Sequence, residues 1–471
     1  MKRRNFIQNI GILSAGTLMV KGNAFAATPQ FPVVRKPKAQ RLFTSEAVEN
    51  AINSFSRKVK DKELVWLFGN CFPNTLDTTV HYSESDGTPD TYVITGDIDA
   101  MWMRDSSAQV WPYMQFAKQD PNIHKMIGGV IRRQTGYILE DSYANAFYKD
   151  ASQKSEWESD HTHMRPGVHE RKWEIDSLCY PIRLAFHFWK STGDTSPFDD
   201  RWVKAMQTVY DTFIDQQRKQ NDGKYRFQRT TANATDTQPM SGYGYPVNPV
   251  GLISSAFRPS DDATLLSFLI PSNLFAVVSL NEAAEMLETI KKETVLAEKM
   301  RALANEVKEA VQKYGIVEHP QFGKIYAFEV DGFGGHILMD DANVPSLLGL
   351  PYLAAVSTND TIYQNTRKFV WSSANPFFYK GTAAEGIGGP HVGKDMIWPM
   401  SLVIRGLTSN DDTEIKYSIA ALKSTHAGTG LMHESFNKDN PAKFTRSWFA
   451  WANTLFGEFL WKVFNERPHL L

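Results

Sequence analysis

The chain has 471 residues, of which 42% are hydrophobic, so it is long enough and apolar enough to bury a large core. Its net charge of -1 argues against a nucleic-acid partner, because such proteins usually carry a basic patch or stripe. Two cysteines, Cys71 and Cys179, cannot make a disulfide framework, and two free buried thiols are the simpler interpretation.

The first 26 residues have the layout of a bacterial export signal. Lys2–Arg4 precede an apolar stretch, Ile7–Val20, and Ala24–Ala26 matches a small-x-small cleavage site. The paired arginines resemble a twin-arginine signal, with an ordinary secretory signal as the alternative. We therefore expect residues 1–26 to be a signal peptide and 27–40 a linker. The mature protein is then periplasmic or extracellular, without a membrane segment, since no later stretch reaches about 18 apolar residues.

Helical periodicity dominates from residue 41 onward. Stripes of apolar residues at three- and four-residue steps run through 202–213, 274–287 and 296–311. Further helices are expected at 44–59, 106–118, 122–140, 172–190, 393–407, 411–423 and 447–464. Strand signals are few. Thr78–Val80 and Thr91–Thr95 flank an Asp-Gly turn and predict a hairpin, and Lys324–Val330 is another candidate strand.

No segment rich in Gly, Ser or Pro divides residues 41–471, so we expect a single domain. About a dozen helices with few strands predict an all-α architecture with a few short β-hairpins in loops. Paired helices in a closed ring, an (α/α)6 barrel, would use that number, although no sequence repeat supports it.

Four polar motifs each stand where an apolar helix is expected to begin. They are Gly96–Ser106, Phe257–Ala263, Met339–Asn343 and His391–Asp395. Each offers Asp, Ser or Asn as an N-cap, so capping alone explains any one of them. Together they hold more carboxylates, Arg and Trp than capping requires. In a helical barrel, such helix starts could gather around one mouth and build an acidic, aromatic pocket.

Such a pocket suits a carbohydrate, because carboxylates and Arg bind hydroxyls through charge-assisted hydrogen bonds. Hydrolysis of a glycosidic bond needs two carboxyls in unequal environments. The adjacent Asp261 and Asp262 are candidates for the acid, since one carboxylate raises the pKa of its neighbour. Glu434 lies in an uncharged stretch apart from His433 and is a candidate for the base, with Glu385 as its rival. The residues alone do not choose within either pair.

Other classes of site are not indicated. His161, His163 and His169 lack HExxH spacing, and Asp340–Asn343 lacks the spacing of an EF-hand. No P-loop, GxSxG or Rossmann fingerprint is present. We therefore expect no metal and no cofactor.

Several of these motifs resemble glycoside hydrolase family 125. The matching stretches, in order from about residue 60 to the C-terminus, include Thr95–Ser106, Glu174–Pro181, Phe257–Ala263, Ile270–Asn273, Met339–Pro345 and His433–Phe436. Asp99 departs from the small residue or Pro common at its position. The resemblance implies an (α/α)6 barrel and a metal-independent, inverting exo-α-1,6-mannosidase that acts on mannose-containing oligosaccharides.

The resemblance also assigns residues. It implies that Asp261, in Arg-Pro-Ser-Asp-Asp, is the general acid and that Glu434, in His-Glu-Ser-Phe, is the general base. The residues expected to grip the terminal mannose are Asp97, Arg104 and Asp105. Those expected to line the pocket wall are Trp102, Arg258, Asn273, His336, Trp398 and Arg446.

Two alternatives stay open: a glycosidase of the same fold that acts on α-glucosides, and a non-catalytic glycan-binding protein. The paired carboxylates argue against the second. Neither the natural glycan nor the oligomeric state follows from the sequence.

Overall fold

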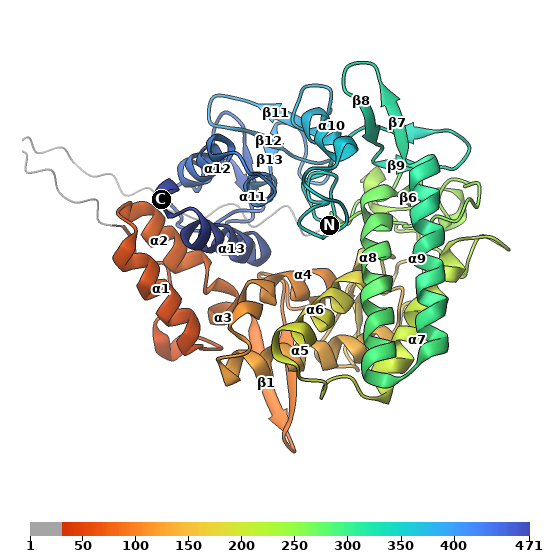
Figure 1. Ribbon diagram of the computed structural model, residues 1–471, viewed down its shortest axis with the longest axis horizontal. Helices are drawn as coiled ribbons and strands as arrows, with labels where there is room; N and C mark the ends of the chain where they lie inside the picture. Colours follow the sequence, from red (N-terminus) through yellow and green to blue (C-terminus); the bar gives the residue numbers. More distant parts are fainter. Residues whose placement is uncertain (1–30) are drawn as a thin grey trace, which may run out of the picture. The chain divides into compact units, whose positions relative to one another are not determined.

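The helices follow one another around a ring in the computed structural model, which describes residues 31–471 (Figure 1). They are α1 (Glu46–Lys58), α2 (Lys62–Cys71), α3 (Asn74–Thr78), α4 (Met103–Val110), α5 (Pro121–Glu140), α6 (Asp176–Thr192), α7 (Asp200–Gln216), α8 (Ile270–Met286), α9 (Thr294–Tyr314), α10 (Thr361–Val370), α11 (Pro399–Leu407), α12 (Asp412–Ser424) and α13 (Ala450–Glu466). Residues 34–471 form one compact unit.

The ring has two layers and closes on itself. Helices α4, α6 and α8 pack against one another in succession, and α11 packs against α13. The last helix, α13, also contacts α2, α3 and α4, which joins the end of the ring to its beginning. Helices α5, α9 and α12 pack outside α6, α8 and α11. This is the expected (α/α)6 barrel.

Short strands decorate the ring. They are β1 (Val80–Ser85), β2 (Thr88–Val93), β3 (Met101–Trp102), β4 (Ala146–Phe147), β5 (Val168–Glu170), β6 (Phe268–Leu269), β7 (Ile316–His319), β8 (Gly323–Tyr326), β9 (Glu329–Val330), β10 (His336–Ile337), β11 (Phe378–Lys380), β12 (Glu385–Ile387), β13 (Met396–Ile397), β14 (Ser435–Asn437) and β15 (Phe444–Thr445). Three antiparallel sheets join distant segments, in the orders β3-β4-β5, β10-β9-β6 and β13-β14-β15.

Most of the expected elements are confirmed, with shifted ends. The hairpin is β1–β2, and its turn residues Asp86 and Gly87 both have positive φ, as a two-residue hairpin turn requires. The stretch 106–118 is α4 followed by a 3-10 turn with Pro112 near its start. The helix expected at 393–407 begins only at Pro399, because residues before it form β13. Helices α2, α3 and α10 were not anticipated.

The interpretation of the polar motifs as helix caps is wrong. The N-cap positions of α4, α8 and α11 are held by Trp102, Leu269 and Trp398, none of which caps through its side chain. The motif Met339–Asn343 precedes turns and no helix. The outer helices α5, α7 and α12, in contrast, are capped by aspartates. The polar groups at the inner helix starts are therefore free for another purpose.

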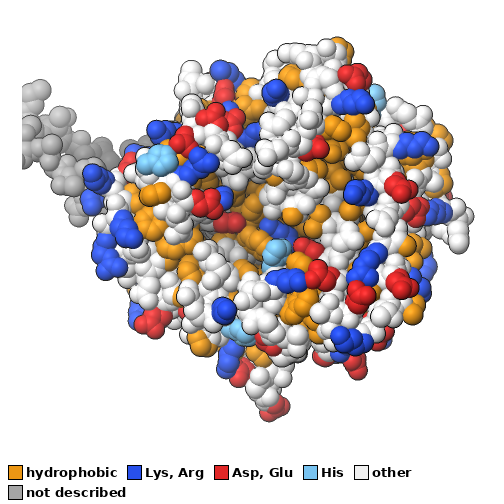
Figure 2. Space-filling model, viewed as in Figure 1, with side chains coloured by type: hydrophobic (Ala, Val, Ile, Leu, Met, Phe, Trp, Pro, Cys, Tyr) orange, Lys and Arg blue, Asp and Glu red, His pale blue; other side chains and the backbone are white. Residues whose placement is uncertain are grey.

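The predicted signal peptide lies outside the described residues, as does part of the predicted linker. Within residues 31–40, Arg35 forms ion pairs with Glu49 and Asp77, at 2.5 and 2.6 Å. Cys71 and Cys179 are buried and free, as expected. In the described part of the chain, no helix has the length and apolar character needed to cross a membrane. Acidic and basic side chains are interspersed over the face seen in Figure 2.

Asp120 joins two outer helices, which gives a test of the fold. Its carboxylate caps α5 through the N–H groups of Asn122 and Ile123 and accepts a hydrogen bond of 2.6 Å from the Ser45 hydroxyl, the cap of α1. We expect Asp120→Ala to lower the free energy of unfolding by about 2–3 kcal/mol, measured by urea titration. The exposed cap Asp411 is the control, and Asp411→Ala should cost about 1 kcal/mol or less. Equal losses would contradict this account.

Candidate active site

The guanidinium of Arg104, on the first turn of α4, is surrounded by carboxylates. Its Nη1 lies 2.7 Å from Glu174 and 3.0 Å from Asp176, its Nη2 lies 3.2 Å from Asp261, and its Nε lies 3.5 Å from Asp105. These acids come from α4, from the start of α6 and from the loop before β6. Every residue of α4 is buried, so the guanidinium is fixed among them.

Four carboxyls around one guanidinium carry an excess of negative charge. Burial raises the pKa of Asp105 to about 6, with Arg104 opposing and Asp261 adding to the rise. Burial likewise raises the pKa of Glu174 and of Asp176, although Arg104 opposes both shifts. Asp105, Glu174 and Asp176 therefore retain protons at a pH where ordinary carboxyls have lost them.

Asp261 lies at the tip of a tight loop. Its N–H donates to the Arg258 carbonyl at 2.9 Å, and the Arg258 N–H donates to the Asp262 carbonyl at 2.8 Å. This is the pattern of a three-residue hairpin loop, in which the last residue adopts a left-handed conformation. Asp261 does so, with φ of 67°. An aspartate thus stands where glycine is usual, which is a departure typical of functional sites.

The neighbouring aspartates have different surroundings. The Asp261 side chain is 26% exposed, whereas that of Asp262 is 2% exposed. Asp262 accepts a hydrogen bond from Ser260 and lies 3.6 Å from His391. Burial acts to raise its pKa, but His391, together with Thr235 and Arg258, outweighs burial and holds the pKa of Asp262 below its usual value. Asp262 is therefore an ionised partner of His391.

The sheet β13-β14-β15 positions a second charged group. Glu434 directly precedes β14 and is buried, and Arg446 directly follows β15. The Arg446 guanidinium lies 3.5 Å from Glu434 and also donates to the exposed Asp97. Asp97, which precedes Arg446 by 349 positions, is thus brought to the pair of Arg446 and Glu434.

His391 connects the two halves of the site. Burial lowers its pKa, but the hydrogen bond and charge of Asp262 and the charges of Glu434 and Asp261 together raise the pKa of His391 to about 9. Its ring centroid lies 6.3 Å from that of Trp398. Contacts join the two loops through this ring: Asp262, the neighbour of Asp261, lies 3.6 Å from His391, and Trp398 beside His391 packs against Phe449. The guanidinium of Arg446, the partner of Glu434, lies over the Phe449 ring.

The remaining predicted pocket residues divide into two groups. Trp398 is buried with its indole N–H unpartnered beside Phe449, and Arg258 is held by Glu329 at 2.6 Å. Trp102 packs edge-on against His169 at the start of α4. Two others do not join the cluster. The Asn273 amide is buried in hydrogen bonds to the backbone of residues 253 and 269. The His336 side chain is exposed on β10 and contacts only a neighbouring carbonyl.

Glu385, the rival base, lies in a different environment. It accepts a hydrogen bond from the Trp371 indole at 3.1 Å, forms an ion pair with Lys380 at 3.0 Å and lies 3.5 Å from Arg405. Those contacts hold the pKa of Glu385 below its usual value despite partial burial. None of these partners belongs to the Arg104 cluster.

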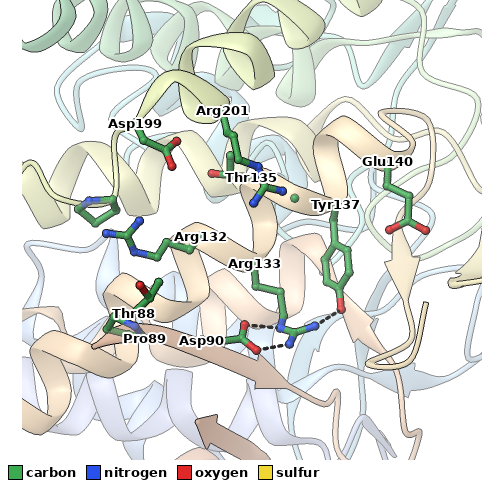
Figure 3. A pocket seen from close by; sticks show the side chains of 12 residues that line it. Thr88, Pro89, Asp90, Arg132, Arg133, Thr135, Tyr137, Glu140, Asp199 and Arg201 are labelled. Atoms are coloured by element: carbon green, nitrogen blue, oxygen red, sulfur yellow. Dashed lines mark hydrogen bonds and ion pairs between the residues drawn. The ribbon is translucent and has the colours of Figure 1, made fainter. Parts of the chain in front are cut away.

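A separate cavity of about 430 Å³ lies between β2, α5 and the start of α7 (Figure 3). It holds three arginines and three carboxylates. Asp90 is fully engaged by Arg133, and Asp199 caps α7. Only Glu140 is left, and one carboxyl does not provide the pair that glycoside hydrolysis requires.

Several residues of the site escaped the sequence reasoning as functional candidates. Glu174 and Asp176 stand in a stretch that carried the family resemblance, and His391 stands in one of the four polar motifs. Lys172 precedes them and carried no signal at all. Within residues 31–471, no group of three or more His, Cys, Asp or Glu side chains is arranged to hold a metal ion.

Known proteins match the chain over most of its length. A family model described as metal-independent alpha-mannosidase (GH125) matches residues 61–461. The meiotically up-regulated gene 157 protein of Schizosaccharomyces pombe is 41% identical over 94% of this chain and 90% of its own length.

Solved structures are similar in fold. An α-mannosidase from Streptococcus pneumoniae, described as metal-independent and in a non-productive complex with α-1,6-mannobiose, is 41% identical, with a TM-score of 0.87 over 90% of this chain and all of its own. A bacterial glucoamylase with acarbose (14% identity, TM-score 0.52) covers 84% of this chain and 55% of its own. A rhamnosidase from Bacillus sp. GL1 (14% identity, TM-score 0.51) covers 91% of this chain and 36% of its own. The last two show the fold alone.

The raised pKa of Asp105 predicts a pH effect on stability. Because its folded pKa of about 6 exceeds its unfolded value, its contribution to stability is full at low pH and is lost as the pH rises through 6. At pH 4 we expect the melting temperature of Asp105→Asn to be close to that of the parent protein or below it. Between pH 4 and about pH 7 we expect the melting temperature of the variant to rise relative to that of the parent protein. Thermal melts across this range measure the difference. The exposed Asp222→Asn should give a flat difference, and a flat result for Asp105→Asn would refute the raised pKa.

Proposed function

Because the chain belongs to the metal-independent α-mannosidases (GH125), we propose that it hydrolyses terminal α-1,6-linked mannose from the non-reducing end of oligosaccharides, with inversion at the anomeric carbon. The α-1,6 linkage is proposed because the structure of the relative from Streptococcus pneumoniae is a complex with α-1,6-mannobiose. Its 41% identity over its whole length supports a shared class of substrate.

In this proposal Asp261 is the general acid and Glu434 the general base. Asp261 gives its proton to the glycosidic oxygen as the bond to the anomeric carbon breaks, so the remaining sugar leaves as an alcohol. Glu434 takes a proton from a water molecule that attacks that carbon from the opposite face, and β-mannose forms. Both carboxyls return to their starting states by exchanging protons with solvent.

The observation that carries the proposal is the series of contacts that brings the loops of Asp261 and Glu434 together: His391 lies 3.6 Å from Asp262 and beside Trp398, and Trp398 packs against Phe449, next to Arg446, the partner of Glu434. The two carboxyls belong to separate loops and have different neighbours, although each lies beside an arginine. Asp261 stands within an acidic cluster around Arg104, whereas Glu434 has Arg446 as its partner. Such unequal environments are what an acid and a base acting together require.

Contacts also favour Asp261 over Asp262 and Glu434 over Glu385. An acid must reach the substrate, and the Asp262 side chain is buried against Ser260 and His391. A base needs lone pairs free for water, and the Glu385 carboxylate already has Trp371, Lys380 and Arg405 around it.

Substrate recognition is proposed for the groups that border these two carboxyls. Asp97 and Arg446 form an ion pair at the exposed side of Glu434, where they can bind the hydroxyls of a terminal sugar. Trp398 offers an aromatic wall and an indole N–H without a partner. The similarity to the glucoamylase does not support activity on α-glucosides, because at 14% identity it shows only a shared fold.

We also propose that the protein is exported, on the layout of residues 1–26 alone. Cleavage after Ala26 would release a chain that begins close to the first described residues.

Loss of either carboxyl should abolish turnover. We expect Asp261→Asn and Glu434→Gln to reduce kcat on α-1,6-mannobiose by about 10²–10⁴-fold, because each removes one proton transfer. Release of mannose is measured, with melting temperatures as a check on folding. Glu385→Gln is the matched control and should keep its activity. Full activity in Asp261→Asn or in Glu434→Gln would sink the assignment, as would an inactive Glu385→Gln.

The stereochemistry of the product tests the mechanism separately. We expect proton NMR of the reaction to detect β-mannose first, followed by slow mutarotation to the α anomer. If α-mannose forms first, the enzyme retains the anomeric configuration. Glu434 would then not act as a general base that activates the attacking water.

A further inference from the structure

Lys172 lies beneath the loop that carries Asp261. It follows β5, and its backbone N–H donates to the Asn145 side chain at 3.0 Å. Its side chain is 4% exposed, and its ammonium donates to the main-chain carbonyl of Asp261 at 2.9 Å and to the Asp236 carboxylate at 2.7 Å. It also lies 3.5 Å from Glu170. The buried ammonium of Lys172 is thus hydrogen-bonded to the backbone of Asp261, the proposed acid.

That backbone needs to be held. Residue 261 has a left-handed conformation, which is unfavourable for a residue with a side chain and is usually taken by glycine in a loop of this kind. If the backbone at Asp261 left this conformation, its Cα–Cβ bond would point in another direction relative to the rest of the loop, and the carboxyl would move. Arg104 holds only one carboxyl oxygen, at 3.2 Å, so it does not fix the backbone.

A network of charges keeps Lys172 in place. Arg229 pairs with Asp160 at 2.6 Å, with Glu170 at 3.1 Å and with Asp236 at 3.1 Å. Two cations and three carboxylates therefore alternate beneath the loop. Burial lowers the pKa of Lys172, but the charges of Glu170, Asp261 and Asp236 outweigh it and leave the pKa raised. The ammonium stays charged over the working range of pH.

We propose that Lys172 is a positioning residue, whose ammonium holds the main-chain carbonyl of Asp261 and thereby directs the Asp261 carboxyl at the glycosidic oxygen. The inference rests on the proposed role of Asp261 as the general acid. Lys172 itself touches neither substrate nor water in the reaction. Its effect is confined to the step in which the leaving oxygen receives a proton.

Because only the protonation step is affected, the loss of rate should depend on the leaving group of the substrate. A sugar alcohol is a poor leaving group and needs the proton, whereas 2,4-dinitrophenolate leaves without one. A variant that misdirects the acid is therefore slow on α-1,6-mannobiose and nearly normal on 2,4-dinitrophenyl α-mannoside. A variant that merely loosens the fold is slow on both.

The experiment compares Lys172→Met with the parent enzyme on these two substrates. We expect kcat on α-1,6-mannobiose to fall about 100-fold with KM changed less than about threefold, because a displacement of about 1 Å has an effect of that size. On the dinitrophenyl substrate we expect a loss of about threefold or less. Lys172→Arg, which keeps the charge and the donors, should recover much of the lost rate. Equal losses on both substrates would overturn the inference.

Arg229→Met is the matched control. Arg229 shares Asp236 and Glu170 with Lys172 but has no contact with Asp261. We expect a lower melting temperature without dependence on the leaving group. Should Lys172→Met fail to fold, Lys172→Gln, which also removes the ammonium, carries the same comparison. A loss in Lys172→Gln that depends on the leaving group supports the inference, and a loss that does not depend on it overturns the inference.

A double variant separates this inference from the proposed function. If Lys172 acts through Asp261, then adding Lys172→Met to Asp261→Asn leaves the residual rate unchanged. A further loss of tenfold or more would mean an independent role and would overturn the inference. If Asp261→Asn alone keeps full activity on mannobiose, the proposed function fails first, whatever Lys172→Met does.

Discussion

The contact between the Arg104 guanidinium and its ring of carboxylates is the interaction on which the rest of the site depends. A buried cation is costly unless it is paired, and here one guanidinium compensates Glu174, Asp176, Asp261 and Asp105 at once. The compensation is incomplete, since several acids share a single positive charge. Burial therefore raises the pKa of Asp105, Glu174 and Asp176, although Arg104 opposes each rise.

The fold makes this concentration of charge possible. Three of the inner helices start directly after a short strand, and the strands belong to sheets that tie together distant parts of the chain. Helix starts carry partial positive charge, so carboxylates beside them are stabilised. The first turns of α4 and α6 supply Arg104 and Asp176, and the start of α11 places Trp398 beside His391. The outer helices α5, α7 and α12, which have aspartate caps of their own, take no part in this arrangement.

Much of the fold could be predicted from the sequence, because apolar periodicity reports directly on the face that a helix buries. The site could be predicted only in part. Asp261 and Glu434 rested on a family resemblance, and local patterns alone left Asp262 and Glu385 equally open. What separates these pairs is long-range: the exposure of one aspartate, and the ion pairs of one glutamate with Lys380 and Arg405.

The failed interpretation of the polar motifs as helix caps has the same cause. An aspartate before an apolar run looks like a cap in one dimension, whereas in the folded chain it faces residues from other helices. Lys172 could not be predicted as a functional residue for a related reason. Its partner is the backbone carbonyl of residue 261, and no sequence pattern indicates such a contact. His391 stood in a motif whose role became clear only beside Asp262.

The central claim is that Asp261 and Glu434 act from opposite faces of one sugar ring with a water molecule between the base and the anomeric carbon. A structure of the enzyme with a non-hydrolysable analogue of α-1,6-mannobiose measures this directly. We expect the carboxyl groups to lie about 6.5–9.5 Å apart, with Asp261 beside the glycosidic oxygen and Glu434 beside a water below the anomeric carbon. A separation of about 5–5.5 Å, or a ligand bound away from both carboxyls, would contradict it.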